Sequence, residues 1–425
     1  MLGEYDMMMR VARDAVLAAA ALVPDTSSAK LMRFGRGQRH IIDRIEAEAA
    51  GLDRSRPTVW VHCASLGEYG IARPVIALLR KRMVCNIVLT FFSPTGYEAL
   101  RRRPSPDVDR VWYLPLDVHS NVTHFLDAVR PDCAAFMVSE YWHNYLHELR
   151  RRNIPAVLVS AIVREGSAFF KWYGGLYRES ARCFSHVFAL DEGTVTRLHR
   201  LGVEGVTLNG DPLFDNALLV ASTPWHQPEL ERFAAGRGVF VAGSVHDDRD
   251  LDLVAGLANR NKDIPFIIVP HEIHEKTLAH IERKVEGKTL RLSQCDTQTD
   301  FEGIQAIIVD SVGSLAYLYR LGRWAYVGGG FTKLLHSVIE PVVYGLPVAF
   351  GPRIHRKVTP AQLMKLGIGR CVETPGAICS WFAQLRQNPE MLDTLRSRAA
   401  KYVNQNSGAT SRVVDVIQRE ICAKN

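Results

Sequence analysis

The stretch VWVHCASLGEYG, residues 59–70, combines a short apolar strand with a loop of small residues and the start of a helical pattern. The strand covers 59–62, the loop contains Ser65 and Gly67, and Glu68 follows where the helix begins. In open α/β sheets, ligands bind beyond the carboxyl ends of the strands, so a carboxylate at this point indicates chemistry. The same acid could serve only to cap the helix, because a negative charge is favourable in the first turn. Both interpretations of Glu68 are open on this stretch alone.

The alternation of strand and helix continues along the chain to about residue 210. Its apolar runs are short and almost uninterrupted, which is typical of a parallel sheet covered by helices on both faces. This half is therefore predicted to be a Rossmann-like domain. We expect its strands at 59–62, 86–91, 111–114, 134–138, 156–160, 186–190 and 206–209.

A second α/β series follows a break in this pattern. Residues 218–237 lose the alternation and contain two prolines, which predicts a domain linker. The chain is thus predicted to be an α/β protein with two Rossmann-like domains, 51–217 and 238–425, that face each other across a cleft. Helices are expected from 376 onward, after strands at 239–243, 264–269, 306–309, 324–327 and 347–350.

Residues 1–50 have a different character. An apolar stretch at 7–23 is interrupted by Arg10, Arg13 and Asp14, and its uncharged part is too short to span a bilayer. An apolar helix face beside clustered cations suits the surface of an anionic membrane, so this segment is predicted to be membrane-associated. The alternative is an amphipathic helix packed on its own domain. The cations that follow the helix are Lys30, Arg33, Arg36, Arg39 and Arg44.

The bulk composition limits the class of protein. A length of 425 residues exceeds what one hydrophobic core normally supports. The 52 Lys and Arg against 45 Asp and Glu give a net charge of +7, which indicates an anionic partner. Nucleic acid is not expected, because the sequence has no basic helix, zinc-finger spacing or aromatic RNA-binding motif. The eight cysteines are scattered without a CxxC pair, so we expect neither disulfides nor zinc.

Three turns rich in small residues follow expected strands of the second half: AGSVHDD at 242–248, DSVGS at 310–314 and VGGGFTK at 327–333. Glycine lets backbone amides close on an anion at a helix N-terminus, so three such turns in one sheet favour a phosphate site. None matches GxGxxG or the P-loop signature, which disfavours a dinucleotide oxidoreductase or a kinase-type NTPase. Asp248 and Asp250 form a DxD sequence that helix capping explains. The candidate phosphate-binding residues are Ser244, Ser311, Gly313, Gly328, Gly329 and Gly330.

The segment HSVIEP after the glycine triplet has Glu340 four residues beyond His336, on one face of an expected helix. A carboxylate there could accept the two hydroxyls of a ribose. HxxxE could also be half a metal site, but no further ligand stands at usable spacing, so no metal is expected. Pro270, His271 and Glu272 close another strand, where His271 could contact a phosphate or a base, or could be structural.

Two segments of the first half carry further candidates. Glu140 begins EYWHNYL, and the run FFKWYGG at 169–175 surrounds Lys171 with aromatic rings. Rings and a cation beside a cleft could stack on a sugar and hold its acid group. We expect the rings to pack in the core, whereas Lys171 and Arg164 are candidates for ligand contact.

The order of these segments resembles one known family, the 3-deoxy-D-manno-octulosonic acid (Kdo) transferases. The resemblance covers roughly residues 25–400, and so many ordered motifs make chance an unsuitable explanation. The similar motifs are WVHCASLGEYG, LTFFSPTGYE, YLPLDV, VRPD, SEYWHNYL, FFKWYGG, GDPLFDN, AGSVH, VPHEI, YVGGGF, HSVIEP and GLPVAFGP.

The resemblance implies a GT-B fold enzyme of lipopolysaccharide synthesis on the cytoplasmic face of the inner membrane. Such enzymes transfer Kdo from CMP-Kdo to the lipid A precursor (lipid IVA), with inversion and without a metal or other cofactor. By the same resemblance Glu68 is the catalytic base, and the AGS, PHE, GGG and HSVIEP segments, with Ser337 among them, hold CMP. Acceptor or Kdo contacts are then expected from Ser65, Gly67, Glu140, Arg164 and Lys171.

The chain departs from the family pattern at three positions. Val138 and Leu213 stand where a basic residue is common, and Ser337 stands where asparagine is common. The change at Leu213 removes a possible contact to phosphate or carboxylate. Two alternatives to the transferase are therefore kept: a non-catalytic lipid-binding or assembly protein, and a sugar-nucleotide epimerase or hydrolase on the same fold.

Overall fold

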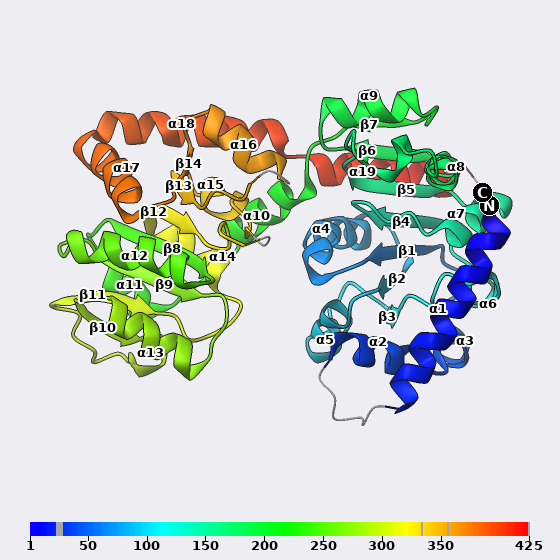
Figure 1. Ribbon diagram of the computed structural model, residues 1–425, viewed down its shortest axis with the longest axis horizontal. Coiled ribbons are helices and arrows are strands. Elements are labelled where there is room, and N and C mark those ends of the chain that lie inside the picture. The colour runs from blue at the N-terminus through cyan, green and yellow to red at the C-terminus, as the bar shows by residue number, and fades with distance from the viewer. Residues whose placement is uncertain (23–28, 333–334, 355–356, 424–425) are drawn as a thin grey trace. The chain divides into compact units, whose positions relative to one another are not determined.

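The chain folds into two α/β units, each built on one parallel sheet (Figure 1). The first unit comprises Met1–Asn216 and Asn406–Asn425, and the second comprises Ala217–Gln405. Lys333, at the end of the expected VGGGFTK turn, lies outside the residues that the structure describes. The computed structural model describes residues 1–22, 29–332, 335–354 and 357–423.

The first sheet has the strand order β3-β2-β1-β4-β5-β6-β7, and its neighbouring strands are parallel. The order reverses between β1 and β4, so this is the switch point at which ligands bind in open α/β sheets. The strands are β1 (Thr58–Cys63), β2 (Asn86–Phe91), β3 (Arg110–Tyr113), β4 (Cys133–Met137), β5 (Ala156–Ala161), β6 (His186–Ala189) and β7 (Val206–Leu208).

Aromatic packing holds the middle of this sheet. Trp60 of β1 is fully buried, and its ring centroid lies 4.9 Å from Phe125, 5.1 Å from Phe136 and 5.3 Å from Tyr145. Close packing of this kind fixes β1 against the helices that cover the sheet. Those helices are α4 (Leu66–Arg82), α5 (Pro94–Arg102), α6 (His119–Val129), α7 (His143–Arg151), α8 (Gly175–Ala181), α9 (Glu192–Arg200) and α19 (Ala409–Cys422).

Three N-terminal helices, α1 (Leu2–Leu22), α2 (Lys30–Gln38) and α3 (Ile41–Ala49), belong to the same unit. The Tyr5 hydroxyl donates to Asp117 Oδ2 at 2.8 Å, and Phe34 is buried in the core. The inner face of α1 is therefore packed on its own domain. Among the residues described, we find no helix that is long and apolar enough to cross a membrane.

The second sheet has the order β10-β11-β9-β8-β12-β13-β14, and its neighbouring strands are also parallel. Its order reverses between β8 and β12. The strands are β8 (Val239–Val245), β9 (Phe266–Pro270), β10 (Lys288–Arg291), β11 (Ile304–Ile308), β12 (Gly322–Val327), β13 (Val348–Phe350) and β14 (Gly369–Cys371). The helices are α10 (Pro212–Ser222), α11 (Pro228–Ala234), α12 (Asp248–Arg260), α13 (Glu275–Lys284), α14 (Leu315–Leu318), α15 (Ile339–Val343), α16 (Val358–Lys365), α17 (Pro375–Gln387) and α18 (Pro389–Asn406).

The prediction of two parallel α/β sheets is confirmed, with local differences. Strands β10 and β14 were not expected, because they are short, partly polar edge strands with no apolar run. Within residues 218–237, predicted to be the domain linker, the chain forms the end of α10 and all of α11. Residues 406–425 fall in the first unit rather than the second. The reason is that Val413, Ile417 and their neighbours on α19 are buried in the first core.

Candidate active site

Glu68 lies in the first turn of α4, directly after the carboxyl end of β1, with Gly67 beside it. Its Oε2 accepts a hydrogen bond from the backbone N–H of Ala64 at 2.5 Å, and its own N–H donates to Ser65 Oγ at 3.4 Å. Ser65 is the N-cap of α4, so the two contacts cap the helix reciprocally. Capping is thus real here, and it also holds the Glu68 carboxylate at the switch point of the sheet.

The electrostatic surroundings make Glu68 more than a cap. Burial and then the charge of Glu140 raise the pKa of Glu68 to about 8, although the Ala64 N–H works in the opposite direction. An ordinary exposed glutamate is a weak base near neutral pH. A carboxylate with this raised pKa binds a proton more strongly, which is what a general base must do.

Glu140 follows β4, the strand paired with β1, and so lies at the same edge of the sheet. Its Oε2 accepts from Trp142 Nε1 at 2.6 Å and lies 3.3 Å from His62 Nε2. The structure thus brings together Glu68 and Glu140, two residues that the sequence named for different roles. It adds His62, which was not predicted, although a histidine inside an otherwise apolar strand was a signal that could have found it.

Backbone strain occurs beside these residues. Val138 (φ 63°), Ser160 (φ 59°) and Ser244 (φ 53°) adopt the left-handed region at or next to the carboxyl ends of β4, β5 and β8. A β-branched residue such as Val138 rarely adopts this conformation. Strain of this kind persists where the surrounding structure imposes it, and it is frequent at functional sites.

The other candidates of the first unit lie in the segment after β5. Arg164 and Lys171 are exposed, and neither acts on the carboxylate of the candidate base. Phe169 is buried, as expected, but Trp172 is 92% exposed and Tyr173 is 57% exposed. The prediction of core packing is therefore wrong for these two rings, because the loop between β5 and α8 directs them to solvent.

The predicted donor segments of the second unit gather at one edge of its sheet. The AGS segment ends β8, the PHE segment ends β9, and the glycine triplet follows β12, and β8 lies between β9 and β12. Ser311 and Gly313 follow β11, the next strand along, and are exposed. The carboxyl ends of parallel strands share an edge, so the sheet collects these loops around its switch point.

The glycine triplet is required by close packing. A Cβ at Gly328 would lie 2.1 Å from Ser244 O, and one at Gly330 would lie 2.5 Å from Gly351 N. Gly329 has a φ of 84°, which side chains other than glycine rarely adopt. The loop after β12 is therefore held against the end of β8 by backbone contact.

Asp250 does more than the helix capping expected from the sequence, because it joins these loops. It is fully buried, and it accepts hydrogen bonds from His246 N at 3.0 Å, Gly329 N at 2.7 Å and Tyr326 Oη at 2.6 Å. Asp247 is the N-cap of α12. The sequence shows only the DxD spacing, whereas the partners of Asp250 come from β12, almost 80 residues away.

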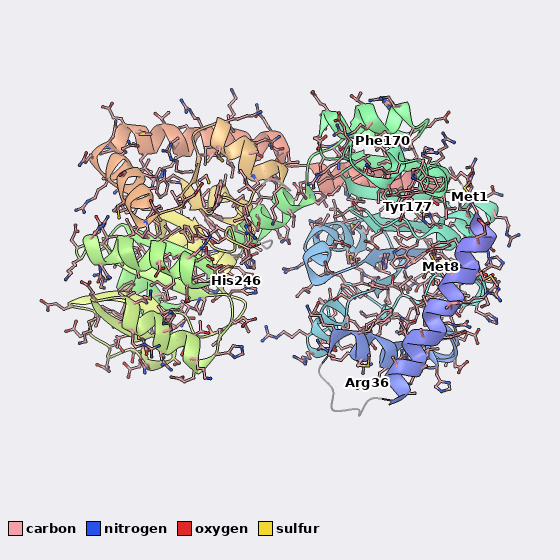
Figure 2. The ribbon with its side chains drawn as sticks, in the orientation of Figure 1. Met1, Met8, Arg36, Phe170, Tyr177 and His246 are labelled. Atoms are coloured by element: carbon pink, nitrogen blue, oxygen red, sulfur yellow. The ribbon has the colours of Figure 1, made fainter. Side chains whose placement is uncertain are left out.

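Three histidines stack at the same edge of the second sheet. The ring centroid of His271 lies 4.6 Å from that of His246, labelled in Figure 2, and 4.5 Å from that of His336. Burial lowers the pKa of His336 to about 4, and the neighbouring histidines and Lys357 add to this. His271 and His336 were predicted as donor contacts. His246 was missed because nothing in its spacing marks it.

The remaining predicted donor residues differ in setting. Burial raises the pKa of Glu340 to about 7. Glu340 and His336 do not share a helical face, because α15 begins only at Ile339, after Ser337. Glu272 is exposed beside the buried end of β9 at Pro270. Glu340 is thus the buried carboxylate of this set.

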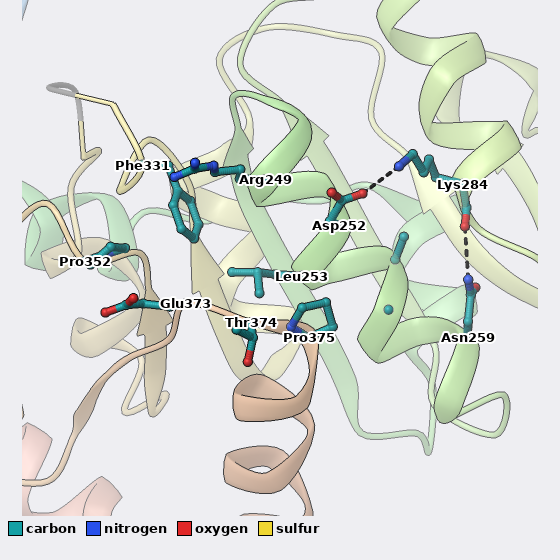
Figure 3. Close-up of a pocket in the computed structure, with 12 residues that line it drawn as sticks. Arg249, Asp252, Leu253, Asn259, Lys284, Phe331, Pro352, Glu373, Thr374 and Pro375 are labelled. Carbon is teal, nitrogen blue, oxygen red and sulfur yellow. Dashed lines mark hydrogen bonds and ion pairs between the residues drawn. The ribbon is translucent and has the colours of Figure 1, made fainter.

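A separate pocket of about 600 Å³ lies between α12 and α17 (Figure 3). Asp252 pairs with Lys284 at 2.6 Å, and Asn259 Nδ2 donates to Lys284 O at 3.0 Å. The pocket contains none of the predicted donor residues, so we give it no part in the site. No group of three or more His, Cys, Asp and Glu side chains that could hold a metal occurs within the described parts of the chain.

Two units, each built on a parallel sheet with its own switch point, define the GT-B fold class. The UDP-GlcNAc 2-epimerase of Neisseria meningitidis has a similar fold, with a TM-score of 0.62 at 15% identity over 85% of this chain and 100% of that one. MurG of Acinetobacter baumannii gives a TM-score of 0.53 at 14% identity, over 85% and 99%. These two likenesses concern the fold alone.

Comparison with known sequences points to one family of enzymes. The family model of 3-deoxy-D-manno-octulosonic-acid transferase (kdotransferase) matches residues 32–216. The Kdo transferases of Haemophilus influenzae and Bordetella pertussis are each 26% identical to the chain, over 85% of it and 86% of their own length. That of Chlamydophila psittaci is 26% identical over 87% and 86%. Over most of its length the chain is similar to the Kdo transferases, and this similarity supports a glycosyltransferase of lipopolysaccharide biosynthesis.

Proposed function

We propose that the protein transfers Kdo from CMP-Kdo to the lipid A precursor, lipid IVA, with inversion. The observation that carries this proposal is Glu68, a carboxylate at a switch point with a pKa raised to about 8, in a chain similar to the Kdo transferases. In an inverting transfer, one base takes the proton of the acceptor hydroxyl while its oxygen attacks C2 of Kdo and CMP leaves. A single carboxylate is sufficient for this step.

The donor CMP-Kdo is assigned to the loops at the edge of the second sheet. The backbone amides of the glycine triplet and the imidazoles of His246, His271 and His336 support binding of a phosphate, and the buried Glu340 supports contact with the ribose. These groups can stabilise the charge that develops on the leaving CMP. Transfer is therefore proposed to need neither a metal nor another cofactor.

The test of the proposed function is the acceptor dependence of CMP release. Incubation with CMP-Kdo should release CMP only when lipid IVA is present, because the acceptor hydroxyl is the nucleophile. Equal release without lipid would identify a hydrolase and would contradict the proposal. Absence of both CMP-Kdo binding and CMP release would support the non-catalytic alternative.

Donor binding should take up protons. His336 has a pKa of about 4 and is neutral at about pH 7, and a bound phosphate favours the charged imidazole and raises that pKa. CMP titrated by calorimetry in buffers of different ionisation enthalpy should show net proton uptake at about pH 7. His336→Gln should remove the uptake and weaken binding about tenfold.

His280→Gln is the matched control for this titration, because His280 belongs to the same unit but pairs with Asp248 on α12. It should retain both the uptake and the affinity. Proton uptake by His336→Gln equal to that of the unchanged protein would contradict the assignment of the phosphate to the histidine stack.

We propose that the first unit associates with the cytoplasmic face of the inner membrane through an apolar patch. The patch consists of Met1, of Met7, Met8 and Val11 on α1, and of Trp172 and Tyr173. Figure 2 labels Met1, Met8 and Tyr177 on this unit. Met1 Sδ lies 3.1 Å from the position a Cβ on Gly175 would take, which joins α1 to the segment that carries the two rings.

An interfacial location is supported by composition and geometry. Exposed methionine and tryptophan at one surface suit the boundary between lipid headgroups and acyl chains. Arg33 contributes less than the sequence suggested, because it pairs with Glu98 at 2.7 Å. Apolar insertion is therefore expected to dominate the binding.

Met8→Glu combined with Trp172→Glu should reduce co-sedimentation with anionic phospholipid vesicles about tenfold, because two inserted apolar side chains become charged. Substitution is preferred to deletion of α1, since deletion would leave Asp117 without Tyr5. Val84→Glu is the control. Val84 is 71% exposed, like Met7, but it follows the C-terminal end of α4 and does not belong to the patch. Binding unchanged in the double variant would contradict the patch.

A further inference from the structure

A chain of hydrogen-bonded side chains connects three strands of the first sheet at the candidate base. His62 is on β1 with no solvent exposure, and its Nδ1 lies 2.9 Å from Thr90 Oγ1 of β2. Its Nε2 lies 3.3 Å from Glu140 Oε2, in the loop after β4. Because β1 pairs with β2 on one side and β4 on the other, the sheet itself holds His62 between these two partners.

Two indole N–H groups decide the donors and acceptors of this chain. Trp60 Nε1 can only donate, and it donates to Thr90 Oγ1 at 2.8 Å. Trp142 Nε1 can also only donate, and it lies 2.6 Å from Glu140 Oε2 and 3.1 Å from His62 Nε2. When Trp142 donates to Glu140, which is the shorter contact, the Thr90 hydroxyl can donate to His62 Nδ1 and His62 Nε2–H can donate to Glu140.

Two observations show that the position of Glu140 is held at a cost. A polar ring buried in a strand is unfavourable unless its hydrogen bonds are made, and an apolar side chain would avoid that cost. Val138, two residues before Glu140, has a φ of 63°, a conformation that is strained for a β-branched residue. The two costs lie on different segments, His62 on β1 and Val138 after β4, and both segments position the Glu140 carboxylate.

We propose that His62 is a positioning residue of the transfer reaction, which acts by holding the Glu140 carboxylate beside Glu68. The inference rests on the proposed role of Glu68 as the base. His62 Nε2 lies 3.3 Å from one oxygen of Glu140, and a hydrogen bond there fixes where that carboxylate lies. The charge of Glu140 then strengthens the hold of Glu68 on a proton. Glu140 is thus assigned the role of supporting the base Glu68 and not that of contacting Kdo.

The groups that act on this pair come from the elements around it. Glu140 acts on Glu68 from the loop after β4, and the backbone N–H of Ala64 opposes it. The buried Cys63 thiol of β1 has a raised pKa, owing to burial and to both carboxylates. Arg73 of α4 acts on Tyr69 and not on Glu68. His62 and Trp142 both contact Glu140, and His62 is the one of the two that lies on a strand of the sheet, where a substitution can change how Glu140 is held without touching Glu68.

The experiment compares His62→Gln with His62→Asn. A glutamine amide reaches the position of Nε2 and can donate to Glu140, whereas an asparagine amide reaches only the position of Nδ1. The pH dependence of kcat/KM should be measured from about pH 5.5 to about pH 9.5, since its acid limb reports the ionisation of the base in the free enzyme. Glu140→Gln provides the reference in which the charge is absent.

We expect Glu140→Gln to move the acid limb about one pH unit lower, because a neighbouring negative charge is removed. His62→Asn should move it in the same direction and lower kcat about tenfold, since Glu140 is no longer held beside Glu68. His62→Gln should keep the limb close to that of the unchanged enzyme. The KM for CMP-Kdo should be similar in all of them.

If the acid limb of the pH profile does not move in His62→Asn, the inference is overturned, whether or not the variant is less stable. A merely structural role of His62 would change the stability and leave the acid limb where it is. Equal shifts in His62→Gln and His62→Asn would also overturn it. Failure of the base assignment is distinguishable: in that case Glu68→Gln retains turnover. Failure of this inference leaves Glu68→Gln inactive.

Discussion

Glu68→Gln should lower kcat for Kdo transfer by about 10³-fold and leave the fold and CMP binding intact, since general bases typically contribute between about 10² and about 10⁴. Glutamine keeps an oxygen that can accept from the Ala64 N–H, so the cap of α4 is retained. What is lost is the proton-accepting carboxylate. The measurement is turnover of CMP-Kdo with lipid IVA, together with thermal unfolding of both proteins.

The stability change should have a definite sign. Glu68 has a folded pKa of about 8, above its value in the unfolded chain, so the unfolded state binds fewer protons between about pH 4.5 and about pH 8. Glu68 therefore makes stability fall as pH rises through that window. Glu68→Gln should remove this fall, and its stability at about pH 8 should equal or exceed that of the unchanged protein.

Glu192→Gln is the control for the catalytic effect. Glu192 also lies in the first turn of a helix that follows a strand of the first sheet. It is exposed, however, and its helix α9 follows β6, which is not a neighbour of β1 in the sheet. Its substitution should leave kcat unchanged. Turnover retained within a few-fold by Glu68→Gln would remove Glu68 from the role of base.

Asp250→Ala should abolish CMP binding and destabilise the second unit by about 3 kcal/mol, because it leaves several buried donors unsatisfied. Those donors are the Tyr326 hydroxyl and the backbone N–H groups of His246 and Gly329. Without Asp250 the glycine triplet and the end of β8 lose the group that joins them. Denaturant unfolding and CMP calorimetry measure the two effects.

Asp250→Asn is the matched control. Its amide oxygen can accept from both backbone N–H groups while its NH₂ donates to the Tyr326 hydroxyl, so the loops stay connected. It should bind CMP within about tenfold of the unchanged protein. A loss of binding in Asp250→Asn as large as in Asp250→Ala would mean that Asp250 contacts the ligand by its charge and does not act by joining the loops.

The sequence was most informative where the pattern is local. Continuous apolar runs such as 59–62 and 86–91 are buried strands, because a parallel sheet needs apolar residues on both faces. The short strands β10 and β14 lie at the edges of the second sheet and have no continuous apolar run, so the sequence pattern could not identify them. Glu68 was identifiable for the same local reason, since it follows a strand directly.

Residues whose role depends on distant partners were not identifiable. His62 gains its role from Thr90 and Glu140, which the sheet places on either side of it. Asp250 gains its role from Tyr326 and Gly329. The spacing along the chain carries no sign of either contact, because strand order is set by the whole sheet. Likewise, the exposure of Trp172 depends on how its loop leaves β5.

The central claim is that the protein joins Kdo to lipid IVA by a base-assisted displacement of CMP. The most direct measurement is mass spectrometry of the lipid after incubation of the purified protein with CMP-Kdo and lipid IVA, with Glu68→Gln in parallel. The account predicts lipid IVA heavier by whole Kdo units, formed by the unchanged protein and not by Glu68→Gln. Unmodified lipid in the presence of consumed CMP-Kdo, or equal product from both proteins, would contradict it.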